Sequence, residues 1–212
     1  MAGAVPTLWW FDRFDDRIGI LPVVGELVHT EELNGEDTIE FHCSEIPAKG
    51  DRLLWRDGPI WREHVVVRTD EPLDGLCSVY AESSLCELLD DFIEEQHLVS
   101  RTAAQAVAVV LAPTRWSQSS CDVTGTVGCV LYHVNAPWAL RRVAEVWGGE
   151  VTAVIAVADG RVSSRSVRLD AQHGSWRGLR FTYGKNMSGC TRTVCSSRTC
   201  TRRCTASGWG CR

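Results

Sequence analysis

The stretch that decides the fold is Thr30-Glu-Glu-Leu-Asn-Gly-Glu-Asp-Thr-Ile-Glu-Phe-His-Cys43, which joins a turn to an alternating strand. The Asn34-Gly35 step is a strong hairpin signal, because both residue types tolerate the positive φ that tight turns need. After it, polar and apolar side chains alternate from Thr38 to Cys43, which is the period of a half-buried strand. The sequence therefore predicts a β-hairpin with one face in a core.

Strand patterns continue on both sides of this hairpin through the first eighty residues. Apolar and β-branched runs are separated by turn signals such as Asp57-Gly58-Pro59. The expected strands are residues 8–11, 17–24, 26–30, 37–43, 51–56, 60–69 and 76–81. Together they predict a meander that closes into a small barrel or sandwich, and residues 1–82 as an N-terminal β-barrel-like domain.

Residues 83–194 mix helices with strands. Behind Ser83, apolar side chains at helical spacing predict a helix with a face made of Leu85, Leu88, Leu89, Phe92 and Ile93, followed by a connector or strand at 97–100. Two further helices are expected over 103–111, capped by Thr102, and over 138–147, opened by Asn135 and Pro137 and ended by Gly148-Gly149. Strands are expected at 121–134, 151–158, 161–169 and 181–183. The fold class is α+β, β-rich, with small β-barrel-like domains and helical insertions.

Composition places the chain among ordinary globular proteins, with 44% apolar and 23% charged residues in 212. The net charge is −5. Residues 195–212 contain four arginines and no acidic residue, so the rest of the chain carries a charge of −9. An acidic body is a poor partner for nucleic acid, because phosphate contacts need clustered Lys and Arg. No secretory signal and no apolar run of membrane-spanning length is visible, so we expect a chain made in the cytoplasm without a membrane anchor.

No residue pattern predicts catalysis, cofactor binding or metal binding, so we expect none of these sites. The acidic groups, Glu31-Glu32 with Glu36-Asp37 and Asp90-Asp91 with Glu94-Glu95, are expected as solvated charge on a hairpin tip and on the outer face of a helix. The six histidines share no metal spacing; they are His29, His42, His64, His97, His133 and His173. There is no GxSxG nucleophile elbow, and residues 125–128 are a strand with glycines rather than a phosphate loop.

Cysteines and tryptophans are unevenly placed. Five scattered cysteines (43, 77, 86, 121 and 129) are expected to be small buried hydrophobes. Five more (190, 195, 200, 204 and 211) crowd the end of the chain at spacings too irregular for a zinc site. Several of Trp9, Trp10, Trp55 and Trp61 are expected to be at least half exposed, and core and subunit interface stay open as explanations.

The tail of residues 195–212 matches nothing upstream and is expected to be disordered or the product of a frameshift. When the codons are read from the third base, permissible choices give LxxEDVYTALYGFGxGLP, an amphipathic strand with glycine turns. We therefore hypothesise a frameshift near Val194. The DNA from codon 185 past the stop decides this, because a restored frame would encode that continuation.

The order of these segments resembles the N-terminal region of phage minor structural proteins, also called the prophage tail endopeptidase family. The resemblance spans about residues 8–194, and the segment EELNGEDTIEF is its most specific part. The other matching stretches are Lys49 to Leu53, Leu85 to Asp91, Ala139 to Gly149, Phe181 to Asn186 and Thr191 to Val194.

The resemblance implies a baseplate-hub fold that forms a trimeric ring or plug at the tail tip of a virion. It implies contacts with further copies of the chain and with distal tail and tape-measure proteins. Lytic activity would belong to C-terminal domains, so residues 83–194 would be an incomplete hub portion and the chain would not be an enzyme. Two alternatives stay open: a tail peptidase or cell-wall hydrolase acting through Asp90 or Glu94, and a zinc-binding interaction module built from the terminal cysteines.

Overall fold

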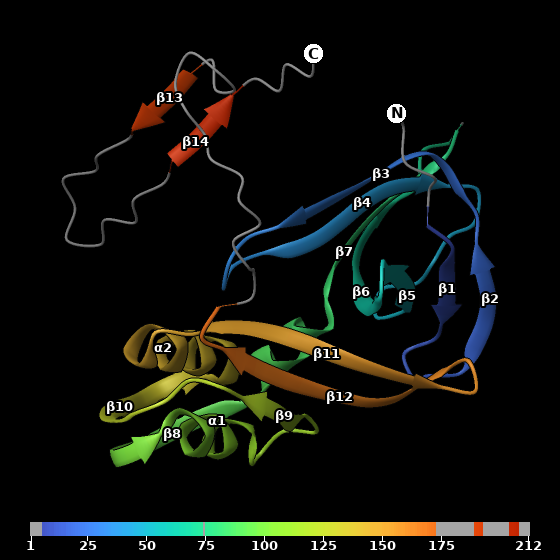
Figure 1. The fold of residues 1–212 in the computed structure, drawn as a ribbon. Helices are drawn as coiled ribbons and strands as arrows, with labels where there is room; N and C mark the ends of the chain where they lie inside the picture. The colour runs from blue at the N-terminus through green and yellow to red at the C-terminus, as the bar shows by residue number, and fades with distance from the viewer. Residues whose placement is uncertain (1–5, 74, 173–188, 193–203, 208–212) are drawn as a thin grey trace. The chain divides into compact units, whose positions relative to one another are not determined.

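Seven antiparallel strands from residues 8–83 form one curled sheet in this computed structural model, which describes residues 6–73, 75–172, 189–192 and 204–207 (Figure 1). The strands are β1 (Leu8–Phe11), β2 (Arg17–Leu21), β3 (Val23–Glu31), β4 (Asp37–Cys43), β5 (Arg52–Asp57), β6 (Ile60–Asp70) and β7 (Cys77–Ser83). Their order is β2-β1-β5-β6-β7-β4-β3. The predicted barrel-like character is confirmed, but the meander is wrong, because β2 and β3 are consecutive in the chain and form opposite edges of the sheet.

The hairpin of β3 and β4 forms where the sequence predicts it. Asn34 adopts a φ of +51°, and the loop closes through the Gly35 N–H, which donates to the Glu32 carbonyl at 3.0 Å. The Asn34 side chain then reaches across the molecule: its Nδ2 donates to the Gly149 carbonyl at 3.1 Å, and its Oδ1 accepts from the Val151 N–H at 2.7 Å. The hairpin tip is thereby fixed to the region that follows the last helix.

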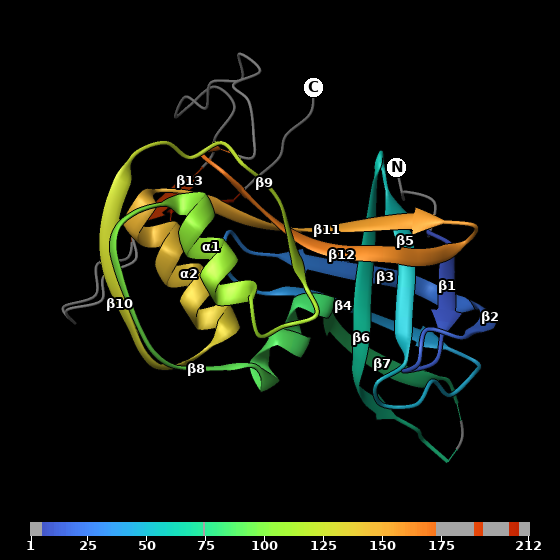
Figure 2. The same cartoon turned by 90° about the horizontal axis from the view of Figure 1, so that it is seen from below.

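Residues 84–170 form a second layer of helices and strands against the sheet. Its elements are η1 (Ser84–Asp90), β8 (Phe92–Thr102), α1 (Ala103–Leu111), β9 (Ser117–Cys121), β10 (Thr126–Asn135), α2 (Ala136–Trp147), β11 (Glu150–Ala158) and β12 (Arg161–Asp170). β8 pairs with β10, and β12 lies between β11 and, in parallel, β9. Figure 2 shows α1 and α2 between the β8–β10 ribbon and the β11–β12 hairpin. None of the described helices is long and apolar enough to span a membrane.

Both long helices begin and end at the predicted signals. Thr102 and Gln105 form a capping box at the start of α1. Asn135 caps α2, because its Oδ1 accepts from the Trp138 N–H at 3.1 Å, and Gly148 ends it at a φ of +80°. The predicted hairpin of residues 151–158 and 161–169 is likewise present as β11 and β12.

The helix predicted from Leu85 to Ile93 is wrong. Residues 84–90 form a short 3₁₀ helix instead, and Phe92 begins the long strand β8, which also absorbs the stretch at 97–100. Leu89 and Phe92 are exposed, so the five apolar residues do not share one buried face. Pairing with β10 along most of its length satisfies the backbone of β8, and this tertiary ladder outweighs a local helical period.

Two apolar cores lie within residues 1–173, which cluster as one unit. One core lies on the seven-stranded sheet around Phe41, and the other packs α1 and α2 against residues that include Phe11 and Leu54. The expectation of half-exposed tryptophans is wrong for all four: Trp55 is buried, and Trp9, Trp10 and Trp61 pack partly buried against these cores. The predicted division of the chain at 82/83 stays a prediction.

Residues 174–212 cluster as a second unit. Within it, β13 (Gly189–Arg192) pairs antiparallel with β14 (Cys204–Ser207). The predicted strand at 181–183, His173, and most of residues 195–212 lie outside the described residues. The expected disorder or frameshift of the tail therefore stays a prediction.

A cluster of three arginines and three acids joins the sheet to the second layer. We call Asp15, Arg52, Glu63, Glu87, Arg115 and Arg165 the central ion cluster. Arg165 of β12 donates to both oxygens of Glu63 and of Asp15, the closest contacts being 2.6 Å each, and Glu63 is only 3% exposed. Arg52 lies beside Asp15 and Glu63, and Glu87 pairs with Arg52 and Arg115. Burial alone would lower the pKa of Arg165, but Glu63 and Asp15 raise it above its ordinary value.

We expect Arg165→Leu to lower the free energy of unfolding by about 3 kcal/mol, because it leaves the buried Glu63 carboxylate with only Arg52, 3.6 Å away. Urea titration followed by tryptophan fluorescence measures this. Arg161→Leu is the matched control, since Arg161 is on the same strand but pairs with Asp16 in solvent, and it should change stability by less than about 0.5 kcal/mol. Equal effects of the two variants would contradict a stabilising role for the cluster.

Candidate functional site

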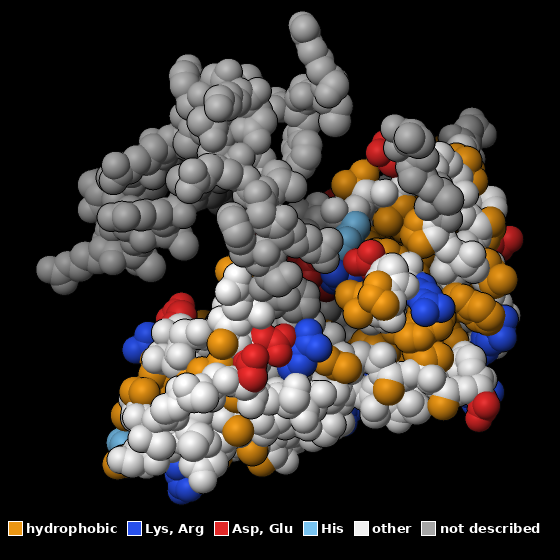
Figure 3. Space-filling view, in the orientation of Figure 1, with side chains coloured by type: hydrophobic (Ala, Val, Ile, Leu, Met, Phe, Trp, Pro, Cys, Tyr) orange, Lys and Arg blue, Asp and Glu red, His pale blue; other side chains and the backbone are white. Residues whose placement is uncertain are grey.

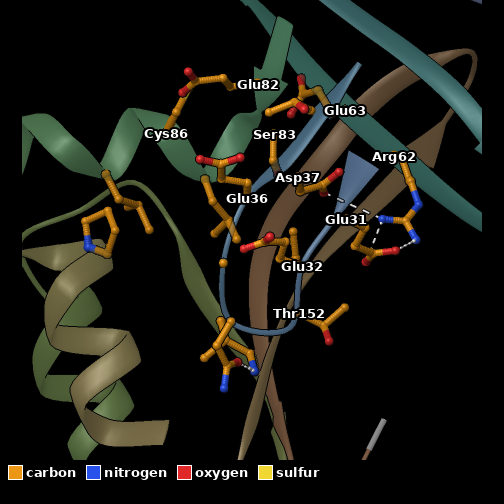
Figure 4. Close-up of a pocket in the computed structure, with 18 of the residues that line it drawn as sticks. Glu31, Glu32, Glu36, Asp37, Arg62, Glu63, Glu82, Ser83, Cys86 and Thr152 are labelled. Atoms are coloured by element: carbon orange, nitrogen blue, oxygen red, sulfur yellow. Dashed lines mark hydrogen bonds and ion pairs between the residues drawn. The ribbon is translucent and has the colours of Figure 1, made fainter. Parts of the chain in front are cut away.

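A pocket of about 300 Å³ opens beside the tip of the β3–β4 hairpin. Its walls come from that hairpin, β6, β7, η1, α2 and β11. Figure 4 shows the carboxylates of Glu31, Glu32, Glu36 and Glu82 around it, with Glu31 bound to Arg62. The apolar part of the wall comes from Leu85, Leu88, Leu140 and Ile155. The pocket is therefore acidic at one side and apolar at the other.

The acidic hairpin tip divides into two kinds of residue. Glu31, Glu32 and Glu36 are exposed, which confirms the expected solvated charge. Asp37, the first residue of β4, is partly buried. Burial alone would raise its pKa, but hydrogen bonds from His29 and His64 hold the pKa of Asp37 well below its usual range. Asp37 is therefore a buried carboxylate anion and the centre of a network.

Two histidines from different strands converge on Asp37. The Nε2 atoms of His29 and His64 lie 2.8 and 3.0 Å from the same oxygen, Oδ1. Trp55 closes the group from β5: its indole N–H donates to His64 Nδ1 at 3.1 Å, and its ring meets that of His29 edge to face. His64 is fully buried, and burial lowers its pKa below the ordinary value although Asp37 opposes this. His64 is therefore neutral at pH 7.

The three ligand-type atoms lie within 4.8 Å of one another, a spacing that a metal ion could use. The hydrogen bond from Trp55 argues against it. An indole N–H only donates, so His64 Nδ1 must be unprotonated, and the proton of the neutral ring is then on Nε2. That Nε2–H donates to Asp37, whereas a metal would need the lone pair of Nε2 and the opposite tautomer. The network is a satisfied hydrogen-bonded cluster, and the expectation of no metal site stays a prediction.

Sequence spacing could not reveal this group, because its members come from β3, β4, β5 and β6. The curl of the sheet brings the edge strand β3 over β5, so that His29 reaches Trp55. One signal was present: Asp37 continues the alternation of Ile39, Phe41 and Cys43, and so belongs to the inward face of its strand. A carboxylate at such a position needs buried partners.

The other acids and histidines that were considered from the sequence do not come together in the structure. Asp90 ends η1 and Glu94 lies on β8, not on a shared helix face, and both are exposed. His97 pairs with Glu95 in solvent at 2.6 Å, and His42 is exposed while Cys43 is buried, as the strand period predicts. Within the described residues, none of these acids or histidines forms a hydrogen bond with a serine or cysteine. These acids and histidines are therefore separate positions on the surface and do not come together as one site.

Because His64 is buried neutral with a lowered pKa, the unfolded chain takes up a proton that the folded chain excludes. Stability should therefore fall as the pH drops below about 6.5, the value of a free histidine, by at most about 1.4 kcal/mol per pH unit for one proton. His64→Gln keeps an acceptor for Trp55 and a donor for Asp37 but does not titrate, so the slope between pH 6.5 and 4.5 should flatten in urea titrations. His42→Gln, at an exposed site, is the control; an unchanged slope in His64→Gln would contradict the assignment.

Comparison with known proteins identifies the fold. No family model and no curated protein matches the sequence, so membership of the minor structural protein family stays a prediction. Among solved structures, the chain is similar to the prophage tail protein gp18 from Listeria monocytogenes EGD-e, with a TM-score of 0.66 and 13% identity over 89% of this chain and 58% of that one. It is also similar to a tail protein from Neisseria meningitidis MC58, with a TM-score of 0.54 and 12% identity over 92% of this chain and 61% of that one. A third similar structure is the prophage MuSo2 43 kDa tail protein from Shewanella oneidensis, with a TM-score of 0.53 and 12% identity over 95% of this chain and 68% of that one. The chain thus spans little more than half of the Listeria protein, and its fold is that of phage tail proteins.

Proposed function

We propose that this chain is a structural component of a phage or prophage tail tip, of the baseplate-hub type, which acts by assembly rather than catalysis. The observation that carries the proposal is a tail-protein fold whose two sheet edges are open. In the part of the chain that the structure describes, neither β2 nor β3 pairs with a further strand on its outer side. Both edges carry exposed apolar side chains: Ile18 and Ile20 on β2, and Val24 and Val28 on β3.

Open, apolar edge strands favour association, because unpaired N–H and C=O groups can extend the sheet into another chain. Figure 3 shows further hydrophobic side chains on the face where the seven-stranded sheet lies. A sheet with two different open edges suits a ring in which one edge of each copy meets the other edge of the next. We propose a homotrimer at the tail tip, with distal tail and tape-measure proteins as neighbours.

We expect the purified chain to run in light scattering at three times its 23.5 kDa mass at micromolar concentration. Ile18→Glu with Ile20→Glu places two charges on the β2 edge and should reduce the particle to a monomer. Ile46→Glu, at an equally exposed residue outside the strands, is the control and should keep the oligomer. A monomeric wild-type chain would overturn assembly by this chain alone.

Labelling tests the location separately. Gold-labelled antibodies against residues 1–173 should mark the tail tip of induced phage particles in electron micrographs. Label along the tail tube, on the head, or absent from particles that contain the chain by mass spectrometry would contradict a tip position.

A zymogram with bacterial cell wall addresses the hydrolase alternative, since cleavage by the chain that is lost in Glu94→Gln would support an enzyme.

A further inference from the structure

Two of the five scattered cysteines face each other in the core. Cys43 is the last residue of β4, Cys77 is the first of β7, and the two are direct partners in the antiparallel ladder. Directly opposite residues share one face of the sheet, with Cα atoms about 4.5 to 5.5 Å apart. A disulfide requires Cα separations of roughly 4.4 to 6.8 Å, so the separation typical of a directly opposite pair lies within the range that a disulfide needs.

The surroundings hold the two thiols together and keep them unreactive. Cys43 is 0% and Cys77 is 4% exposed, in the core cluster that contains Phe41 and Val79. The thiols interact with each other, and the Cys43 thiol also donates to the Glu45 carbonyl at 3.0 Å. Burial raises the pKa of Cys43 to about 11 and also raises that of Cys77. Both are therefore protonated at neutral pH, and a thiol reacts only as its thiolate.

The other described cysteines lack this arrangement. Cys121 is opposite Leu169, and Cys129 is opposite Leu98, so neither has a cysteine as its ladder partner. Cys86 lies on the 3₁₀ helix η1 and so has no partner in a strand ladder, and burial raises its pKa to about 12. Cys86, Cys121 and Cys129 are also only partly buried, so the expected burial of the five scattered cysteines holds fully for Cys43 and Cys77 alone.

We propose that Cys43 and Cys77 form an intramolecular disulfide when the folded protein meets a small-molecule disulfide such as oxidised glutathione. Both residues are at strand ends, where ladders open most readily and a thiolate can form. That thiolate attacks the oxidant and releases one reduced glutathione. The second thiolate then attacks the protein sulfur of the mixed disulfide and releases a second glutathione. Two electrons thus pass from the protein thiols to oxidised glutathione, and the two protons that the protein thiols lose are taken up by the two glutathione thiolates that leave. The proposal does not depend on the tail-tip function.

The bridge would join β4 to β7 covalently at one end of the sheet. It closes a loop that includes β5 and β6, so it constrains the unfolded chain and stabilises the folded one. A reducing cytosol keeps such a pair as thiols, whereas an oxidising exterior favours the disulfide. The protein would therefore keep both thiols in a reducing compartment and become more stable wherever a disulfide oxidant is present.

The test uses the full reduced chain, incubated folded with and without oxidised glutathione. Remaining thiols are then alkylated in denaturant, and the protein is digested with trypsin and a glutamate-specific protease. Glu82 separates Cys77 from Cys86, so a Cys43–Cys77 linked peptide can be identified by mass. We expect that peptide to dominate after oxidation, with Cys86, Cys121 and Cys129 recovered mainly as alkylated thiols. Free thiols or glutathione adducts at Cys43 and Cys77 would overturn the proposal.

A stability measurement gives a second readout. Oxidation should raise the midpoint of thermal unfolding of the wild type by roughly 5 to 10 °C, and reductant should reverse this. Cys129→Ala, which leaves the pair intact, should keep the shift, and Cys77→Ala should lose it. If Cys77→Ala fails to fold, the linked peptide of the wild type still decides, because that assay needs no variant. An equal shift in a folded Cys77→Ala protein would also overturn the proposal.

Discussion

The ion pairs of Arg165 with Glu63 and Asp15 are the constraint on which the rest of the structure depends. They join residues 102 and 150 positions apart, and Glu63 has almost no contact with water. A carboxylate at such a position costs several kcal/mol unless it is paired, so the sheet cannot bury β6 in this way without β12 beside it. Since β12 also carries β11 and β9, one arginine fixes a whole layer. Figure 2 shows the β11–β12 hairpin of that layer extending across β5 and β6.

Polar side chains with partners on other elements also fix the hairpin tip. Asn34 provides the left-handed turn residue for the β3–β4 loop and also fixes that loop to Gly149 and Val151. Beneath it, Asp37 gathers His29, His64 and, through His64, Trp55. The buried polar groups of Asn34 and Asp37 have hydrogen-bond partners within the protein, and these hydrogen bonds hold the strands in position.

Local signals allowed the turns, the caps and most strands to be predicted. Asn34, Thr102, Asn135 and Gly148 each act through neighbouring backbone groups, which sequence spacing records. The strand order and the Asp37 group could not be predicted, because they depend on which strands the curl of the sheet brings together. The helix predicted after Ser83 was wrong for a related reason. The apolar period there suits a helix, but pairing with β10, whose residues are 24 to 43 positions further along the chain, favours the strand β8.

A protein that works by assembly needs a rigid interior and an exterior left open to partners, and the two requirements are met by different parts of the sheet. The central strands β5 and β6 carry Arg52, Trp55, Glu63 and His64, which lie in the ion cluster and the Asp37 group and help to fix the interior. The edge strands β2 and β3 carry exposed isoleucine and valine with an unpaired backbone side. Of the two edges, β2 carries no residue of the central ion cluster or of the Asp37 group, and β3 carries one, His29. A neighbouring chain that pairs with the outer backbone of β2 would therefore leave both groups intact. The proposed assembly would then add contacts at the sheet edges to an interior that the buried ion pairs already hold in place.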